Sequence, residues 1–187
     1  MEELDSLSGK LLIAMPGMPD SRFRQTVTYL CGHNSDGALG IVINRPSDMK
    51  LGEVFEQLSL DSRDRDLANQ SILKGGPVNR ERGFVLHEAG GSWDSTISIC
   101  GNIEVTTSRD VLSAIAGGKG PRRALLALGC AGWGEGQLES ELRSNSWLVV
   151  DATEEILFET PYEQRWAASA ALLGVDVSRL GLQAGNA

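Results

Sequence analysis

The sequence has little of what usually holds a metal ion or a disulfide framework. Its 187 residues include three cysteines and two histidines. The cysteines, Cys31, Cys100 and Cys130, are odd in number and far apart, which is typical of a protein from a reducing cytosol. Cys31 and His33 form one possible ligand pair, but no second pair accompanies them, so the sequence predicts no metal site.

Long apolar runs and an excess of basic residues are also missing. No run approaches the roughly 20 apolar residues that span a bilayer, and the acidic start MEELDSLSGK lacks the features of a signal peptide. We therefore expect a cytoplasmic protein without a membrane segment. Seventeen Lys and Arg against 25 Asp and Glu give a net charge of −8. Direct nucleic-acid binding is disfavoured, because nucleic-acid-binding domains usually carry a basic stripe.

The residues that are present describe a globular chain. Apolar residues make up 41% and charged residues 22% of the sequence, which excludes extended disorder. Neither a repeat nor a linker divides the chain, so we predict a single domain over residues 1–187, with residues 1–8 loose. Twenty-two glycines and many short strands between helices indicate the α+β class.

Two hairpins are the clearest strand signals. β-Branched and aromatic residues over Thr26–Cys31 and an apolar run over Leu39–Ile43 flank the turn dipeptide Asp36-Gly37. A second hairpin is expected around Gly101-Asn102, between Thr96–Cys100 and Ile103–Thr106. Further strands are predicted at Leu11–Ala14, Gly83–His87, Arg123–Leu128, Trp147–Val150 and Ile156–Phe158.

Helices are predicted from apolar spacing and capping residues. Leu51–Leu58 has its apolar residues at helical intervals, and Gly136–Arg143 places Leu138 and Leu142 on one face. Thr107–Ala116 is expected to end with Gly117 in the left-handed conformation. The final helix is predicted to begin at a capping box in Thr160-Pro161-Tyr162-Glu163 and to end at Gly174.

Cys130 lies where a predicted strand gives way to glycines and then to a helix. This order is typical of a nucleophile elbow, which needs glycine two residues before and after the nucleophile. Gly132 fits that pattern and Leu128 does not, and His33 or His87 would have to supply the base. A cysteine-dependent hydrolase or transferase therefore stands as an alternative beside a buried structural cysteine.

Three other patterns have structural interpretations that are simpler than a functional one. The glycine turns lack the Lys-Ser/Thr ending of a phosphate loop and the dinucleotide spacing, so no cofactor is predicted. The three carboxylates Glu135, Glu139 and Glu141 are interpreted as a solvated helix face. Ala167–Leu180 is similar to part of a helix-turn-helix, but too little chain follows Gly174 for a recognition helix. Packing of a C-terminal helix explains that pattern better than a DNA-binding role.

Several ordered pieces of the chain together carry a resemblance to a known family. They include Pro16-x-Met18-x-Asp20-x-x-Phe23, Gly37-Ala38-x-Gly40-Ile41-Val42-Ile43-Asn44-Arg45-Pro46, Gly75-Gly76-Pro77-Val78 and Gly129-x-Ala131-Gly132-Trp133-x-x-Gly136-Gln137-Leu138-Glu139-x-Glu141. The chain is similar to the AlgH/YqgE family of bacterial proteins across nearly its full length. This resemblance implies one α+β domain with a branched mixed or antiparallel sheet, partly barrel-like and surrounded by helices. It also implies a regulator of transcription whose biochemical activity is unsettled, and it transfers no catalytic residue. An aromatic residue usually occupies the place of Cys130 in the family, which favours a packing role there.

We therefore predict a non-enzymatic regulatory protein that acts through a protein or small-molecule partner bound in a surface cleft. Candidate residues are polar or conformationally special and follow strands, where binding sites tend to form. Direct DNA binding remains a further alternative. The predicted cleft residues are Pro16, Met18, Asp20, Asn44, Arg45, His87, Gly132, Trp133, Gln137 and Glu139.

Overall fold

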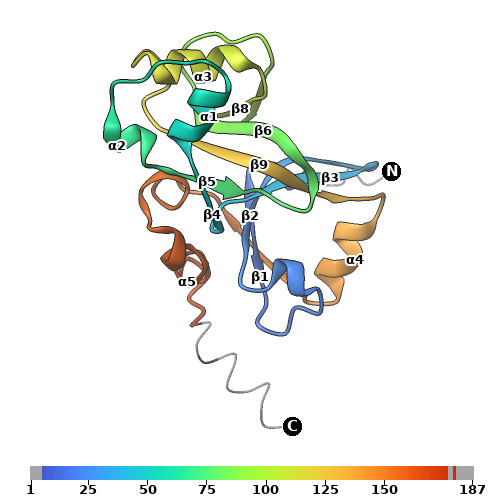
Figure 1. The fold of residues 1–187 in the computed structure, drawn as a ribbon. Coiled ribbons are helices and arrows are strands. Elements are labelled where there is room, and N and C mark those ends of the chain that lie inside the picture. The colour runs from blue at the N-terminus through green and yellow to red at the C-terminus, as the bar shows by residue number, and fades with distance from the viewer. Residues whose placement is uncertain (1–5, 177–178, 180–187) are drawn as a thin grey trace.

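The computed structural model describes residues 6–176 and 179 (Figure 1). Ten strands form one sheet around which the helices are arranged. The strands are β1 (Lys10–Ala14), β2 (Val27–Asn34), β3 (Gly37–Val42), β4 (Pro46–Lys50), β5 (Ser71–Lys74), β6 (Val78–Glu88), β7 (Thr96–Cys100), β8 (Ile103–Thr106), β9 (Ala124–Trp133) and β10 (Trp147–Asp151).

Strand β9 is the branch point of this sheet. The main strand order is β10-β1-β2-β3-β9-β6-β8-β7, and β5 joins β9 outside that path and carries β4. Pairing is antiparallel except between β5 and β9. The C-terminal part of β9, Ala131–Trp133, pairs with β3, whereas its earlier part pairs with β6 and β5. The predicted α+β class with a branched, partly barrel-like sheet is confirmed.

The helices gather in two places. Figure 1 shows α1, α2 and α3 at the end of the molecule that holds β6 and β8, while α4 and α5 flank β1 and β2 on opposite sides. None of the helices that the structure describes is long and apolar enough to cross a membrane. The helical segments are η1 (Ser21–Phe23), α1 (Leu51–Gln57), α2 (Arg65–Ala68), α3 (Arg109–Ala116), α4 (Gln137–Arg143), η2 (Glu155–Glu159), η3 (Tyr162–Gln164) and α5 (Arg165–Ala171).

Both predicted hairpins are present. Asn34 pairs with Gly37 across the first turn, and Cys100 pairs with Ile103 across the second. Gly37 has a φ of 142° and lies so close to the Trp133 carbonyl that a Cβ would overlap it. Glycine is therefore required there both by the turn and by the neighbouring strand.

Strand β9 corrects the prediction that the apolar run stops at Gly129. The strand continues through Cys130 to Trp133, because Gly129 adopts a φ of +83° and permits a close approach to the Gly76 carbonyl. The glycine bends the strand without ending it. No tight turn therefore precedes or follows Cys130.

The segment after β10 corrects two further predictions. Ile156–Phe158 is not a strand: it lies in the π-helical η2, where Ile156 and Leu157 are buried. Thr160 does not cap the last helix, because its hydroxyl donates to the Glu155 carbonyl and α5 begins only at Arg165. Buried apolar contacts at η2 outweigh the β-propensity of its residues.

Gly117 and Gly174 were both predicted to end a helix. Gly117 has a φ of −83°, so the prediction of a left-handed residue there is wrong, and the left-handed residue is Gly118. Gly174 has a φ of 72°, but α5 already ends at Ala171, with Leu172 as its C-cap. The loose start predicted for residues 1–8 and the end of the helix-turn-helix-like pattern fall partly outside the described residues.

Candidate functional site

The candidate site is a surface cleft of about 480 Å³ between η1 and the strand ends of β3, β4 and β5. Four of its lining side chains are cationic, namely Arg22, Arg45, Lys74 and Arg80, and none of the described lining residues is Asp or Glu. We call this feature the basic cleft. Apolar and small residues complete it: Phe23, Val42, Ser47, Leu73, Gly76, Pro77 and Leu128.

Arg22 is held at the cleft wall by the residue that starts its 3-10 turn. The Asp20 carboxylate accepts a hydrogen bond from the Arg22 backbone N–H at 3.0 Å. It also forms an ion pair with Arg22 Nη2 at 2.7 Å. These bonds lower the pKa of Asp20 below its ordinary value. The guanidinium also lies over the Phe23 ring, 5.7 Å from its centroid. One aspartate thus fixes both the turn and the direction of the arginine.

Asn44 and Arg45 attach the end of β3 to the loop after η1. The Asn44 side chain accepts a hydrogen bond from Val27 N–H at 2.9 Å and donates one to the Gln25 carbonyl at 2.8 Å. Arg45 donates to the carbonyls of Arg22 and Arg24. Burial lowers the pKa of Arg45, and no carboxylate of the described chain pairs with it. Its charge is therefore satisfied by carbonyl dipoles alone.

The floor of the cleft needs glycine. Gly76 has a φ of +150°, and a Cβ there would overlap the carbonyl group of Cys130 on β9. A Cβ on Gly75 would likewise overlap the Gly129 carbonyl. The turn after β5 can therefore lie against β9 only without side chains. This close approach brings Lys74 and Pro77 to the same opening as Leu128.

An aromatic cluster supports one wall from behind. Phe23 stacks on Trp133 with ring centroids 6.2 Å apart, and it meets the edge of Trp147 at 5.7 Å. The Glu141 carboxylate accepts hydrogen bonds from both indole N–H groups, at 2.8 Å from Trp133 and 2.9 Å from Trp147. A single carboxylate thus fixes two tryptophans, which in turn hold the phenylalanine that faces the cleft.

The structure brings part of the predicted site together. Of the ten predicted residues, Arg45 lines the basic cleft, and Asp20 and Asn44 position its walls. Trp133 packs behind Phe23, in the same cluster as Met18, which is 5% exposed and so belongs to the core instead of lining the cleft. The remaining predicted residues, Pro16, His87, Gly132, Gln137 and Glu139, do not line it.

His87 lies away from the basic cleft. It is fully buried on β6, where its ring contacts the Glu88 carbonyl at 2.8 Å and the Thr106 hydroxyl at 2.7 Å. The edge of its ring also meets Trp93. Both ring nitrogens are satisfied inside the sheet, so His87 is a structural residue.

The carboxylates of α4 are not a solvated face as predicted. Glu139 Oε1 lies 2.6 Å from His33 Nε2, and this contact lowers the pKa of Glu139. His33 Nδ1 accepts a hydrogen bond from the Leu7 N–H at 3.0 Å. Of the three carboxylates, only Glu135 is fully exposed. Glu139 therefore links α4 to β2.

Gln137 and Gly132 have local roles beside this link. The Gln137 side chain accepts a hydrogen bond from Gly134 N–H at 3.0 Å and donates to Glu141 at 3.2 Å, which fixes the turn between β9 and α4. Gly132 is exposed on β9 opposite Leu39. Pro16 lies in the turn that joins Met18 N–H to the Met15 carbonyl.

Cys130 is a packing residue by its geometry. Its side chain is 1% exposed within the apolar core, and burial raises the pKa of its thiol. Within the described residues, both histidine rings have other partners and neither bonds to Cys130. A nucleophilic thiol needs a lowered pKa and a nearby base. The arrangement therefore argues against the cysteine-dependent enzyme.

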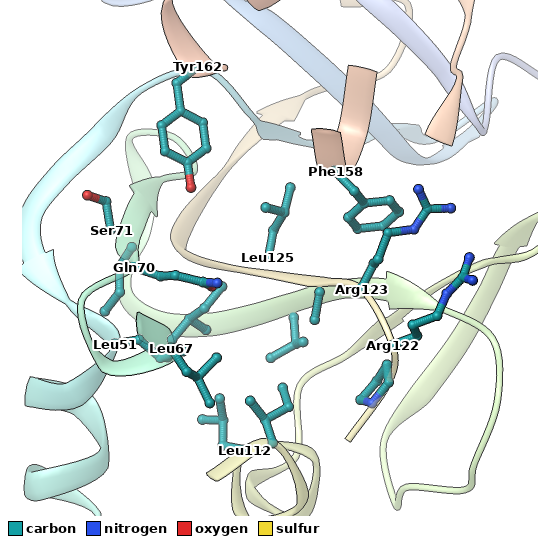
Figure 2. Close-up of a pocket in the computed structure, with 16 residues that line it drawn as sticks. Leu51, Leu67, Gln70, Ser71, Leu112, Arg122, Arg123, Leu125, Phe158 and Tyr162 are labelled. Carbon is teal, nitrogen blue, oxygen red and sulfur yellow. The ribbon is translucent and has the colours of Figure 1, made fainter. Parts of the chain in front are cut away.

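A second cavity of about 220 Å³ lies under α1 and α3. Figure 2 shows Tyr162 and Phe158 on one side of it and Leu51, Leu67 and Leu112 on the other. Arg123, at its edge, contacts three carboxylates, those of Glu88, Glu154 and Glu159. We call this group the Arg123 network. Among the described residues, no group of three His, Cys, Asp or Glu side chains is placed to hold a metal ion.

Sequence reasoning missed several residues of these sites. Lys74 and Arg80 were missed because a single sequence does not show which surface cations share an opening. Phe23 and Gly76 lie in pieces that carry the family resemblance, which was the one available sign of their importance. The contacts of His33 and Glu141 depend on how α4 packs against β2 and β10, and spacing along the chain cannot reveal them.

The fold and the cleft together define a class, an α+β protein with a branched sheet and a basic surface cleft. The chain belongs to the AlgH-like family, whose family model matches residues 11–178. It is 50% identical over 184 residues to a UPF0301 protein of Methylococcus capsulatus, covering 98% of each chain. It is 50% identical over 186 residues to a UPF0301 protein of Ralstonia pickettii, covering 100% of this chain and 98% of that one.

Solved structures of similar proteins agree with this assignment. The solution structure of the AlgH protein from Pseudomonas aeruginosa matches with a TM-score of 0.80 at 50% identity, covering 100% of both chains. The crystal structure of a protein from Corynebacterium diphtheriae matches with a TM-score of 0.75 at 18% identity. It covers 97% of this chain and 94% of that chain. At that identity the second likeness concerns the fold alone.

Proposed function

We propose that this protein is a non-enzymatic regulatory protein that acts by holding a partner in the basic cleft. The observation that carries the proposal is the convergence of four separate segments on one opening. They are η1, the end of β3 with β4, the end of β5 with its turn into the start of β6, and β9. All four of these segments contain pieces of the family resemblance, which also supplies the regulatory role. Concave sites between elements that combine apolar walls with few polar groups are where ligands bind.

On this proposal the protein regulates transcription indirectly, through its partner and not through contact with DNA. A chain with a net charge of −8 repels phosphate backbones, and four cations in a cleft are fewer than the basic stripe of a DNA-binding domain. The helix-turn-helix-like pattern has a packing explanation, since Ala170 and Ser169 on α5 are buried and Trp166 Nε1 donates to the Ala14 carbonyl at 2.9 Å. The three free cysteines are consistent with action in the cytoplasm.

The test compares two variants with equal loss of charge. Lys74→Gln/Arg80→Gln changes two exposed cations of the cleft, and Arg63→Gln/Lys119→Gln changes two exposed cations elsewhere. Each tagged full chain is used to capture proteins and small molecules from a bacterial lysate, quantified by mass spectrometry. We expect a set of partners that the cleft variant loses and the control variant keeps. Equal retention by both variants would contradict the proposal.

Direct DNA binding is tested in the same series. A salt titration on duplex DNA should show no affinity even at low ionic strength, where phosphate contacts are strongest. Affinity that falls steeply with salt and is lost in the cleft variant would replace the indirect role with a direct one.

A further inference from the structure

We propose that the basic cleft binds a small organic anion, with its phosphate or carboxylate group at Arg45, Lys74 and Arg80 and an apolar, preferably aromatic, body against Phe23 and Pro77. This proposal rests on the proposed function, because it takes the cleft to be the binding site. It adds the chemical class of the ligand.

The first argument is an imbalance of charge. The chain as a whole is acidic, yet the cleft is lined by four cations and no described carboxylate. Asp20 compensates Arg22 from outside the lining. Across the part of the chain that the structure describes, Lys74 and Arg80 form no ion pair. Such a local excess of positive charge in a concave site attracts anions.

The second argument is the state of Arg45. Its guanidinium is partly buried, and it donates to two carbonyls, those of Arg22 and Arg24, without a carboxylate. These bonds use the Nη1 and Nη2 atoms and fix the plane of the group. A fixed guanidinium with unused N–H donors is suited to the oxygens of a phosphate or carboxylate.

The third argument is a rigid apolar wall. Phe23 is held by stacking on Trp133 and by the edge of Trp147, and both indoles are tied to Glu141. An aromatic face that is already fixed loses little conformational entropy when a ligand packs on it. The proximity of this face to the cations therefore selects a ligand that is charged at one end and apolar at the other.

The size of the site favours a small molecule over a macromolecule. Its volume of about 480 Å³ lies in the range of roughly 300–1,000 Å³ that holds drug-sized ligands. An acidic protein segment would need a longer groove to bury a comparable share of its surface. We therefore commit to a small molecule and treat an acidic peptide as an outcome of the test.

The experiment titrates the full chain with four probes and follows backbone NMR shifts. The probes are phenyl phosphate, phenylacetate, benzyl alcohol and inorganic phosphate. We expect phenyl phosphate or phenylacetate to bind more tightly than benzyl alcohol and inorganic phosphate, with shifts at Gly76 and Phe23. Comparison of the first two probes distinguishes a phosphate headgroup from a carboxylate. Affinity should fall as salt is added.

Matched variants locate the charge. Lys74→Gln/Arg80→Gln should weaken the better anion at least about tenfold, the effect of losing one charge-assisted contact. Arg63→Gln/Lys119→Gln should leave affinity unchanged. Because the four positions are exposed, neither variant is expected to unfold the protein.

The outcomes separate this proposal from the proposed function. Equal binding of benzyl alcohol and the anions, or equal affinity in both double variants, overturns the anion assignment and leaves the cleft as a binding site. Binding of an acidic peptide without any probe overturns the small-molecule assignment. If partner capture also survives the cleft variant, the proposed function fails as well.

Discussion

Arg123 and Arg45, which lie at different cavities, have opposite partners. In the Arg123 network the guanidinium contacts three carboxylates, and Glu88, the most buried of them, is 5% exposed. In the basic cleft Arg45 contacts only carbonyls, and Lys74 and Arg80 have no carboxylate partner within the described chain. Paired arginines stabilise the fold, whereas unpaired cations around an opening are available to a ligand.

The largest expected effect comes from removing a carboxylate of the Arg123 network. Glu88→Gln should reduce the free energy of unfolding by about 2 kcal/mol, because it leaves Arg122 and Arg123 without their shared buried carboxylate. Urea denaturation followed by circular dichroism measures this loss. Phenyl phosphate affinity in the basic cleft should not change. A variant as stable as the parent would mean that the network does not stabilise the fold.

The next effect concerns the aromatic wall that separates the cleft from α4. Glu141→Leu should reduce the free energy of unfolding by about 2 kcal/mol, because two indole N–H groups lose their acceptor. Near-ultraviolet circular dichroism should report the released tryptophans, and phenyl phosphate should bind more weakly. Glu135→Leu, on the exposed side of the same segment, is the control and should change none of these quantities.

Arg45→Gln tests the cleft arginine that contacts carbonyls and no described carboxylate. We expect a stability loss of only about 1 kcal/mol, because the side chain makes hydrogen bonds to carbonyls and no ion pair. Binding of phenyl phosphate should weaken at least about tenfold. Arg45→Lys keeps the charge and should recover part of the affinity. Full affinity in Arg45→Gln would remove Arg45 from the site.

The smallest effect concerns Glu139 and His33, a contact outside both cavities. The pKa of Glu139 is lowered from 4.5 by the hydrogen bond from His33. Its stabilising contribution is therefore fully present above that value and is lost as pH falls through the lower folded-state pKa. The parent should lose stability more steeply than Glu139→Gln between about pH 5 and about pH 3, by about 1 kcal/mol or less. Parallel stability curves for the two proteins would show that the contact has no energetic weight.

Local signals predicted much of the fold. The hairpin at Asp36-Gly37 and the helix over Leu51–Leu58 depend on residues a few positions apart, and both are present. The continuation of β9 through Gly129 and the π-helical turn at Ile156 could not be predicted. Both depend on contacts with distant strands, which override local preference.

The candidate site was predictable only in part, for the same reason. Arg45 and Asp20 were predicted because they are polar residues beside strand ends, and Arg45 lines the basic cleft. Lys74 and Arg80 give no local signal, and their importance comes from the opening that they share. A histidine at a strand end can face either solvent or the core, and for His87 the neighbours across the sheet placed its ring in the core.

The sequence by itself determined the acidic net charge, the hairpin turns, the glycine positions and membership of the α+β class. These follow from composition and from interactions between near neighbours. Only the tertiary structure decided which cations meet a carboxylate. Arg123 meets Glu88, Glu154 and Glu159 because β9 passes beside β6 and η2, whereas β5 ends with Lys74 at an opening whose described lining has no Asp or Glu. Charge pairing depends on distances between residues that are remote in sequence, and folding sets those distances.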